Sequence, residues 1–169
     1  MTVAAELELK SFVLLRLGER RFAVAAGEIA ELVAPSRIFR FPHRTAKIEG
    51  VILRRGRIIP VCDVAEALTG KRVIDRRLYL IAVRRYGLTN EWVALPVTGE
   101  CELITAELME ASPSDEPHVG GWLSHSGDAI EVLNLEALTP GVGEFSTNAS
   151  IQPAREPRPA TLGDAEARL

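Results

Sequence analysis

The sequence predicts a mainly β protein built from two small β-barrels, and three observations support this. Of the 169 residues, 47% are hydrophobic but only 5% are aromatic. The apolar runs are short and rich in Val, Ile and Leu, which favours many brief strands separated by tight polar turns. A hairpin followed by a short helix occurs twice, which favours two related barrels over one sandwich.

The opening segment predicts a β-hairpin. Apolar, strand-like runs at residues 12–17 and 22–25 flank residues 18–21, Gly-Glu-Arg-Arg, which suit a hairpin loop. In residues 27–32, two apolar side chains lie three positions apart beside two glutamates. This spacing predicts a single amphipathic helical turn, which Pro35 ends.

Residues 50–64 are the most informative segment of the chain. They read Gly-Val-Ile-Leu-Arg-Arg-Gly-Arg-Ile-Ile-Pro-Val-Cys-Asp-Val, two β-branched runs joined across a tight turn that carries Arg54, Arg55 and Arg57. In such a unit the strands pack in the core, and the turn is exposed and can contact a partner. Guanidinium donors suit a protruding contact of this kind. We therefore predict a docking site at this tip.

The same segment leads into a predicted helix over residues 64–69. The Asp63 carboxylate can accept the N3 amide, Glu66 occupies the capping-box position, and Gly70 supplies the C-terminal stop. Turn geometry and capping explain the motif residues of this unit without a ligand. Those interpreted as structural are Gly50, Gly56, Pro60 and Asp63.

The second half repeats this plan, because a hairpin beginning at Gly121 also runs into a short helix after Asn134. The other predicted elements of this part of the chain are strands at 77–83, 92–97, 121–123 and 129–133, a turn at 87–90, a polar hairpin loop at 124–128 and a helical turn at 135–138.

We expect the chain to divide into three parts. Residues 1–10 form a flexible N-terminal segment, and residues 11–138 carry both barrels, with a division near residues 85–90. Residues 139–169 contain four prolines, scattered Gly and Ser, and Phe145 as their one aromatic residue. That composition predicts a disordered tail.

Charge is strongly segregated along the chain. Residues 37–85 hold thirteen Lys and Arg against four Asp and Glu, whereas residues 86–169 hold three against fourteen. This asymmetry suggests two surfaces of opposite sign, able to orient different partners or successive copies of a ring-forming module. The alternative is that the halves complement each other within one fold.

Several classes of site are not expected. No apolar stretch approaches the roughly 20 residues that span a bilayer, and the N-terminus lacks a secretory pattern, so we expect a cytosolic protein without membrane insertion. Cys62 and Cys101, 39 residues apart in apolar segments, are interpreted as reduced core thiols. His43, His118 and His125 share no ligand spacing, so neither a metal nor another cofactor is expected.

An enzyme is not expected either. The chain has no Gly-x-Ser-x-Gly elbow, no phosphate-binding Gly-rich loop and no paired carboxylates with a base. Residues 124–128, Ser-His-Ser-Gly-Asp, include the residue types of a hydrolase triad. Adjacent residues in one turn cannot converge on a shared reacting atom, so a hairpin loop explains them.

A nucleic-acid-binding small barrel is the rival interpretation of the basic segment. That segment has few aromatic residues on which bases could stack, namely Phe39, Phe41 and Tyr79, and Tyr79 lies in a strand expected to be buried. The acidic second half would also repel phosphate. We therefore do not expect nucleic acid as a partner.

The residues resemble the CheW-like domain of bacterial chemotaxis coupling proteins, which also forms the regulatory domain of the CheA histidine kinase. The resemblance covers about residues 11–138 and begins with Leu17-Gly18, Phe22 and Ile29-Ala30-Glu31-Leu32. The signature resembles Gly-Val-x-Asn-Leu-Arg-Gly-x-Ile-x-Pro-Val-x-Asp-Leu, with its spacing kept throughout. The matching residues are Gly50, Val51, Arg55, Gly56, Ile58, Pro60, Val61 and Asp63.

Two positions depart from the family pattern. The family's Asn-Leu before the Arg is Leu53-Arg54 here, which adds charge to the docking tip and bears on receptor choice. The usual acidic position in the second half's Val-Asp-x-Val segment is Pro96, at the edge of the second barrel.

The resemblance implies two SH3-like five-stranded β-barrels with short helices, in a non-catalytic scaffold that couples chemoreceptors (methyl-accepting chemotaxis proteins) to a CheA-type histidine kinase. In the family, the first barrel contacts the kinase regulatory domain, and a groove between the barrels takes the cytoplasmic tip of the receptor. Such a protein is cytoplasmic and is recruited to receptor arrays at the inner membrane. The alternative is an auxiliary copy in a non-flagellar pathway, with surface motility or a second messenger as output.

Carried over by position, Arg55 is the receptor-contact arginine, with Arg54 and Arg57 beside it, and Ile29 with Glu31 belongs to the neighbouring docking surface. From the residues alone, Ile29 fits a groove or a core equally well. Trp92 and Trp122 are interpreted as core residues.

Overall fold

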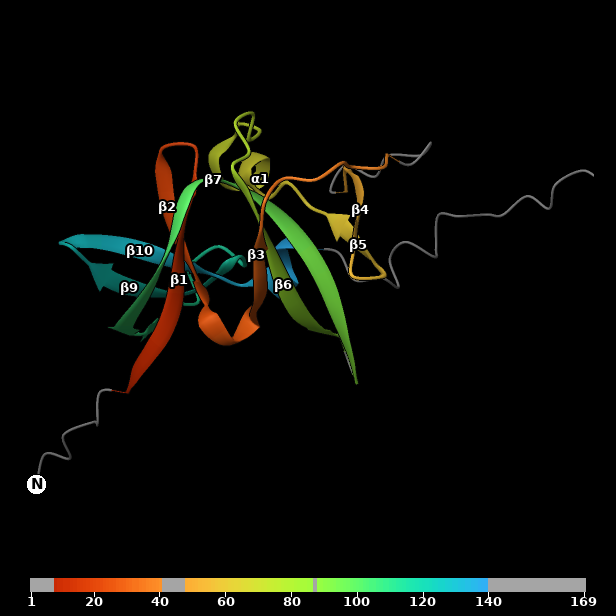
Figure 1. The fold of residues 1–169 in the computed structure, drawn as a ribbon. Helices are drawn as coiled ribbons and strands as arrows, with labels where there is room; N and C mark the ends of the chain where they lie inside the picture. Colours follow the sequence, from red (N-terminus) through yellow and green to blue (C-terminus); the bar gives the residue numbers. More distant parts are fainter. Residues whose placement is uncertain (1–7, 41–47, 87, 140–169) are drawn as a thin grey trace, which may run out of the picture.

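The structure, a computed structural model, describes residues 8–40, 48–86 and 88–139 and is mainly β, as predicted (Figure 1). The strands of the described part are β1 (Leu9–Leu17), β2 (Arg20–Ala25), β3 (Ile29–Val33), β4 (Gly50–Arg54), β5 (Arg57–Val61), β6 (Leu78–Tyr86), β7 (Thr89–Glu107), β8 (Met109–Glu110), β9 (Val119–His125) and β10 (Asp128–Leu133). The helical elements are the 3₁₀ turn η1 (Ala26–Glu28) and the helices α1 (Ala65–Thr69) and α2 (Leu135–Leu138).

The strands form two barrels that share one long strand. Barrel A consists of β1, β2, β9, β10 and residues 98–107 of β7, with the short β8 paired to β9. Barrel B consists of β3, β4, β5, β6 and residues 89–97 of β7. In Figure 1, β7 rises through barrel B and bends over into barrel A. The predicted fold of two small barrels is confirmed.

Each barrel combines parts of both halves of the chain. The β4–β5 hairpin of the first half joins β7 through a parallel contact between Val61 and Ala94. The β9–β10 hairpin of the second half joins β2 in the same way, with Val132 opposite Ala23.

Residues 85–90 lie at the paired ends of β6 and β7 inside barrel B. The division expected there is therefore wrong, because the chain leaves barrel B only at residues 97–98, within β7.

Alternate side chains of the central strands enter different hydrophobic cores. In β1, Phe12 and Leu14 lie inside barrel A, whereas Val13, Leu15 and Leu17 lie in a core between the barrels. β6 alternates in the same way between barrel B and the inter-barrel core. A strand buried on both faces needs an unbroken apolar run, which is what the sequence shows at these two places.

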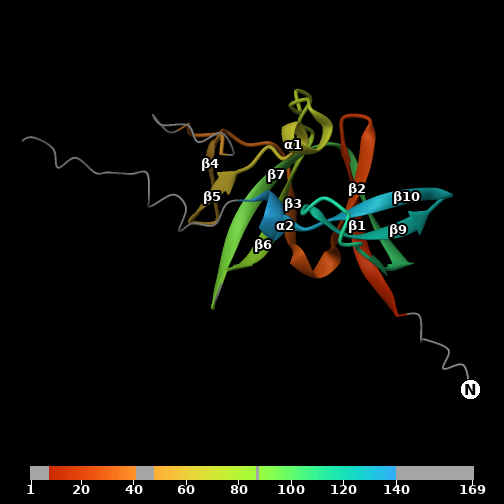
Figure 2. The same ribbon diagram turned by 180° about the vertical axis from the view of Figure 1, so that it is seen from behind.

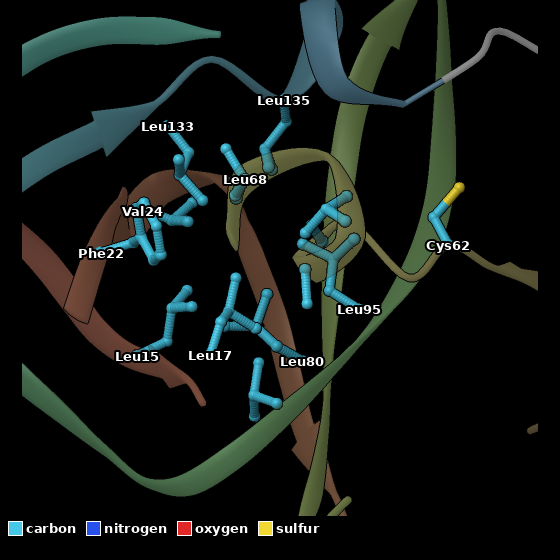
Figure 3. Packing of buried hydrophobic residues seen from close by; sticks show 14 of the residues in the cluster. Leu15, Leu17, Phe22, Val24, Cys62, Leu68, Leu80, Leu95, Leu133 and Leu135 are labelled. Carbon is cyan, nitrogen blue, oxygen red and sulfur yellow. The ribbon is translucent and has the colours of Figure 1, made fainter. Parts of the chain in front are cut away.

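The inter-barrel core is the largest cluster among the described residues. Figure 3 shows Leu17 of β1 near Leu80 of β6 and Leu95 of β7, with Leu68 of α1 and Leu135 of α2 reaching into the same cluster. Figure 2 shows both helices between the two barrels. Each fully buried leucine contributes about 1.5–3 kcal/mol, so this cluster holds the barrels in one arrangement.

The predicted helical turn at residues 27–32 is wrong. η1 ends at Glu28, and the chain continues as β3, which pairs with β6. Between Ile29 and Glu31 the register shifts, because Ala30 is an extra residue, a β-bulge. Pairing with β6 satisfies the backbone of this segment, so helical hydrogen bonds are not needed there.

Other local predictions are confirmed or refined. The β1–β2 hairpin is present, α1 ends at a left-handed Gly70, and α2 forms as predicted. The loop predicted at residues 124–128 is shorter, because β9 extends to His125 and β10 starts at Asp128.

Neither tryptophan is fully buried, contrary to the prediction that both are core residues. Trp92 and Trp122 are half-buried. The Trp122 Nε1–H group donates a hydrogen bond to Asp115 at 3.1 Å. An indole on a barrel surface can bury its apolar ring while its polar edge finds a partner, which explains the intermediate burial.

Neither cysteine forms a disulfide bond with another described residue. Cys62 is buried in the inter-barrel core, and Cys101 packs against that core with part of its surface exposed. Burial raises the pKa of the Cys101 thiol, which keeps it protonated and weakly nucleophilic.

The ends of the chain are only partly covered by the structure. β1 begins at Leu9, inside the segment 1–10 expected to be flexible. Residues 1–7, and all but Thr139 of the tail predicted at 139–169, lie outside the described residues, as do Phe41 and His43. No helix within the described ranges is long and apolar enough to cross a membrane.

Candidate partner-binding site

The predicted docking site lies at the tip of the β4–β5 hairpin. Arg54 and Arg57 form the last cross-strand pair, and Arg55 and Gly56 form the turn. Their φ angles are 48° and 74°, which fits a type I′ hairpin turn. Gly56 adopts this conformation freely, whereas the left-handed conformation costs Arg55 about 1 kcal/mol. An arginine kept at a position that suits Asn or Gly points to a role for its side chain.

Glu31 of β3 contacts both Arg54, which precedes the turn, and Arg55, which lies in it. The Arg54 guanidinium donates from Nη2 to Oε1 and from Nε to Oε2, the latter at 3.3 Å. Arg55 Nη2 lies 3.4 Å from the same Oε1 atom. The hydrogen bond from Arg54 holds the pKa of Glu31 below its usual value, and Glu31 in turn raises the pKa of Arg54. The hairpin tip is thereby fastened to the edge of β3.

Arg57 is held by a different contact. Its guanidinium carbon lies 4.5 Å from the centre of the Trp92 ring, a cation–π distance. Trp92 comes from β7 and packs against the core of barrel B. This contact explains why the indole is half-buried, since the guanidinium covers one face of the ring.

These side chains surround a shallow pocket of about 230 Å³ beside the core of barrel B. Three guanidinium groups and one carboxylate give its lining a net positive charge, which suits an anionic group of a partner. Arg55 is more exposed than Arg54, with 76% of its side chain exposed, compared with 41% for Arg54. The lining residues are Ala30, Glu31, Arg54, Arg55, Arg57, Ile59 and Trp92.

Ile29 does not join this site. It packs against the inter-barrel core, which decides between the two interpretations that the residues left open. The bulge at Ala30 changes the register, so that Ile29 meets the core while Glu31 meets the hairpin tip. The structure therefore unites Glu31 with the three arginines and separates Ile29 from them.

The outer face of the same hairpin is apolar, which the sequence analysis missed. Leu53 and Ile58 are cross-strand partners with 58% and 69% exposure, whereas their neighbours Ile52 and Ile59 are fully buried. The alternation of β-strands puts Leu53 and Ile58 on the face opposite to Arg54. The run Ile58-Ile59 held a signal for this, because adjacent residues in a strand point to opposite faces, so only one of the two can enter the core of barrel B.

Gly50 and Pro60 have structural roles in this hairpin, as interpreted. A Cβ atom on Gly50 would lie 2.5 Å from the carbonyl oxygen of Phe39, so the crossing of the chain at Phe39 requires glycine. Pro60 lies opposite Val51, whose backbone N–H and C=O both bond to Phe39. Since this pair forms no ladder hydrogen bond, the missing N–H of Pro60 costs nothing.

Asp63 caps α1 through a different amide from the one predicted, and it also binds residues beyond the helix. Its Oδ1 accepts from the Ala65 amide at 3.0 Å, one residue earlier than the N3 amide. Its Oδ2 accepts from the Val73 amide at 3.3 Å and from the Arg76 guanidinium at 3.1 Å. Arg76 also lies 2.6 Å from Glu49. This network, with both carboxylates less than 10% exposed, ties α1 and the 71–76 segment to β4.

The charge segregation follows the two barrels. Residues 29–97, which include all of barrel B, hold thirteen Lys and Arg against six Asp and Glu. Residues 9–25 and 98–138, which form barrel A, hold four against ten. The barrels meet through the hydrophobic inter-barrel core, and ion pairs such as Arg20 with Glu131 lie within barrel A. The molecule therefore presents one basic and one acidic barrel.

Two barrels that expose an arginine tip beside an apolar hairpin face have the features of a protein-interaction module. Residues 11–143 match the CheW-like domain family. The chain belongs to that family, as the sequence signature indicated.

Two relatives are informative. The chain is 22% identical over 134 residues to a probable chemotaxis protein CheW of Rhizobium etli, a match that covers 76% of this chain and 86% of the relative. The crystal structure of the scaffolding protein TtCheW from Thermoanaerobacter tengcongensis superimposes with a TM-score of 0.66 at 22% identity. That match covers 83% of this chain and 94% of TtCheW, and it establishes the common fold.

Proposed function

We propose that this protein is a non-catalytic adaptor that couples chemoreceptors, the methyl-accepting chemotaxis proteins, to a CheA-type histidine kinase in a chemotaxis-like pathway. Membership of the CheW-like family supports an adaptor of chemotaxis signalling. The observation that carries the proposal is Arg55, which is exposed at the hairpin tip and kept in an unfavourable backbone conformation. Such a protein works in the cytoplasm, recruited to receptor arrays at the inner membrane.

The two faces of the β4–β5 hairpin suit two partners. The tip, with its positive charge, receives the cytoplasmic helical tip of the receptor, and the outer face with Leu53 and Ile58 receives the regulatory domain of the kinase. A hydrophobic patch with a charged rim is typical of such interfaces, and the arginines orient the approaching partner.

The basic charge of barrel B does not favour nucleic acid. Arg54 and Arg76 are bound to carboxylates of the same chain, and Arg57 covers an indole ring on which a base would otherwise stack. These contacts occupy the cations that a phosphate backbone would bind and cover the ring on which a base would stack.

The test is a pull-down of the full chain with the kinase regulatory domain and, separately, with a receptor-tip fragment. We expect both to bind, Arg55→Asp to weaken only receptor binding, and Leu53→Ser to weaken only kinase binding. Ser126→Asp is the matched control, because Ser126 occupies the same turn position in the β9–β10 hairpin, with φ 52°. The proposal fails if neither partner binds at micromolar concentrations and modest salt, or if Arg55→Asp lowers melting and binding together.

A further inference from the structure

Two arginines compete for one carboxylate at the hairpin tip. Oε1 of Glu31 is within reach of both Arg54 and Arg55, but only Arg54 also contacts Oε2. A fork of two parallel N–H donors is the strongest arrangement for a carboxylate. Arg54 therefore holds Glu31, and Arg55 has only the longer 3.4 Å contact.

Glu31 would not stay unpaired if Arg54 were absent. Its side chain is only 22% exposed, and a partly buried carboxylate without a partner is costly. Arg55 is the other guanidinium within ion-pair distance of Glu31 among the described residues. Without Arg54, Arg55 would turn inward to pair with Glu31, and the tip would lose an exposed cation.

We propose that Arg54 is a positioning residue: by binding Glu31 it leaves Arg55 directed outward to bind a carboxylate on the partner helix. This inference rests on the proposed function, since it takes the receptor tip as the occupant of the site. It adds that the receptor segment at this contact is acidic. Charge complementarity supports this, because three arginines outweigh one glutamate around the pocket.

The affinity test is a double-mutant cycle on the full chain, with binding to a receptor-tip fragment measured by calorimetry. Arg54→Ala should weaken binding roughly tenfold, the scale of one interfacial charge pair, because Glu31 then captures Arg55. Adding Glu31→Gln to Arg54→Ala should restore affinity to near that of the wild type. Glu31→Gln alone should bind at least as well as the wild type, and binding by Arg55→Gln should show a weaker salt dependence.

Two results in this cycle would overturn the proposal. If the double variant binds as weakly as Arg54→Ala, then Arg54 acts by touching the partner or by supporting the fold. If Arg54→Ala binds like the wild type, Glu31 does not capture Arg55. Binding of the kinase regulatory domain, which uses the other face of the hairpin, should remain unchanged in all variants and reports on the fold.

A second measurement needs no partner, so it separates this inference from the proposed function. The Nε–Hε signal of Arg55 is followed by NMR relaxation in the wild type, in Arg54→Ala and in the double variant. We expect the Arg55 side chain to become more rigid in Arg54→Ala and mobile again in the double variant. Unchanged mobility of Arg55 would overturn the inference even where receptor binding is intact. Absence of receptor binding by the wild type would overturn the proposed function and the carboxylate contact, but not the positioning of Arg55 by Arg54.

Discussion

The two closing hairpins of the molecule, β4–β5 with α1 and β9–β10 with α2, share one backbone plan but carry different side chains. Each hairpin has a glycine five positions before its two-residue turn, and each turn has positive φ at both residues. The same four residues, Glu-Ala-Leu-Thr, occur at 66–69 at the end of α1 and at 136–139, where Thr139 directly follows α2. In both helices the threonine hydroxyl donates to the carbonyl four residues earlier.

The two hairpin turns have the same backbone conformation but differ in their side chains. The first turn carries Arg54, Arg55 and Arg57, whereas the second carries Ser126 and Asp128. Asp128 pairs with Arg21 of β2, so the second tip is tied to its own barrel and presents no surplus of positive charge. The comparison shows that the hairpin, turn and cap form a structural unit used twice. The proposed contact function resides in the side chains added to one copy.

The largest predicted difference between the two units concerns their caps. The Asp63 carboxylate accepts hydrogen bonds from two backbone amides and from Arg76. The Asn134 side chain accepts one from the Glu136 amide. Asp63→Ala should lower the free energy of unfolding by about 3 kcal/mol, because it breaks a buried ion pair. Asn134→Ala should cost about 1 kcal/mol, the usual value of a cap. Urea unfolding of both variants tests this, and equal costs would contradict it.

The next effect should be the same in both units. A Cβ on Gly50 would approach the Phe39 carbonyl oxygen to 2.5 Å, and one on Gly121 would approach the Met109 carbonyl oxygen to 2.7 Å. Gly50→Ala and Gly121→Ala should each destabilise by about 2–3 kcal/mol through overpacking. Gly27→Ala is the control, since nothing lies within 4 Å of its Cβ position. A loss confined to one hairpin would show that the units are not equivalent.

A smaller effect separates fold from binding at the turns. Asn tolerates positive φ better than Arg or Ser, so Arg55→Asn and Ser126→Asn should each raise stability, by up to about 1 kcal/mol. Only Arg55→Asn should weaken binding of the receptor tip. Thermal melting and calorimetry of the two variants give both values, and equal binding by both would remove Arg55 from the site.

The smallest effect concerns the helices. Burial raises the pKa of Glu28, and the negative charge of Glu136 on α2 raises it further. Because the folded-state pKa lies above the unfolded value, ionised Glu28 destabilises the fold at neutral pH, and this penalty disappears as the pH falls below the ordinary pKa of a glutamate. Glu136→Gln should therefore raise Tm slightly at pH 7 but not at pH 3. Glu66→Gln, at the matching position of α1, is the control, because the charge that acts on Glu28 is that of Glu136.

Local features of the fold could be predicted from the sequence because each depends on a few adjacent residues. The Arg55-Gly56 turn, the Gly70 stop and the β1–β2 hairpin follow from backbone preferences of neighbouring residues. The spacing of residues 27–32 predicted a helical turn, but it does not distinguish the two structures. A β-bulge and a helical turn both place residues three positions apart on the same face. The exposure of Leu53 and Ile58 depends on which face of the hairpin meets the core, and that face depends on the rest of barrel B.

The sequence by itself determined the fold class, the family, the two repeated units and the basic tip of one of them. Only the tertiary structure decided that barrel A takes its closing hairpin β9–β10 from the far part of the chain, whereas barrel B lies within residues 29–97. Only the structure, likewise, shows that Glu31 meets Arg54 across 23 positions in sequence. The reason is physical. Turns and caps are stabilised by contacts within a few residues, whereas pairing between distant strands and ion pairs between strands depend on the register and packing of the whole sheet.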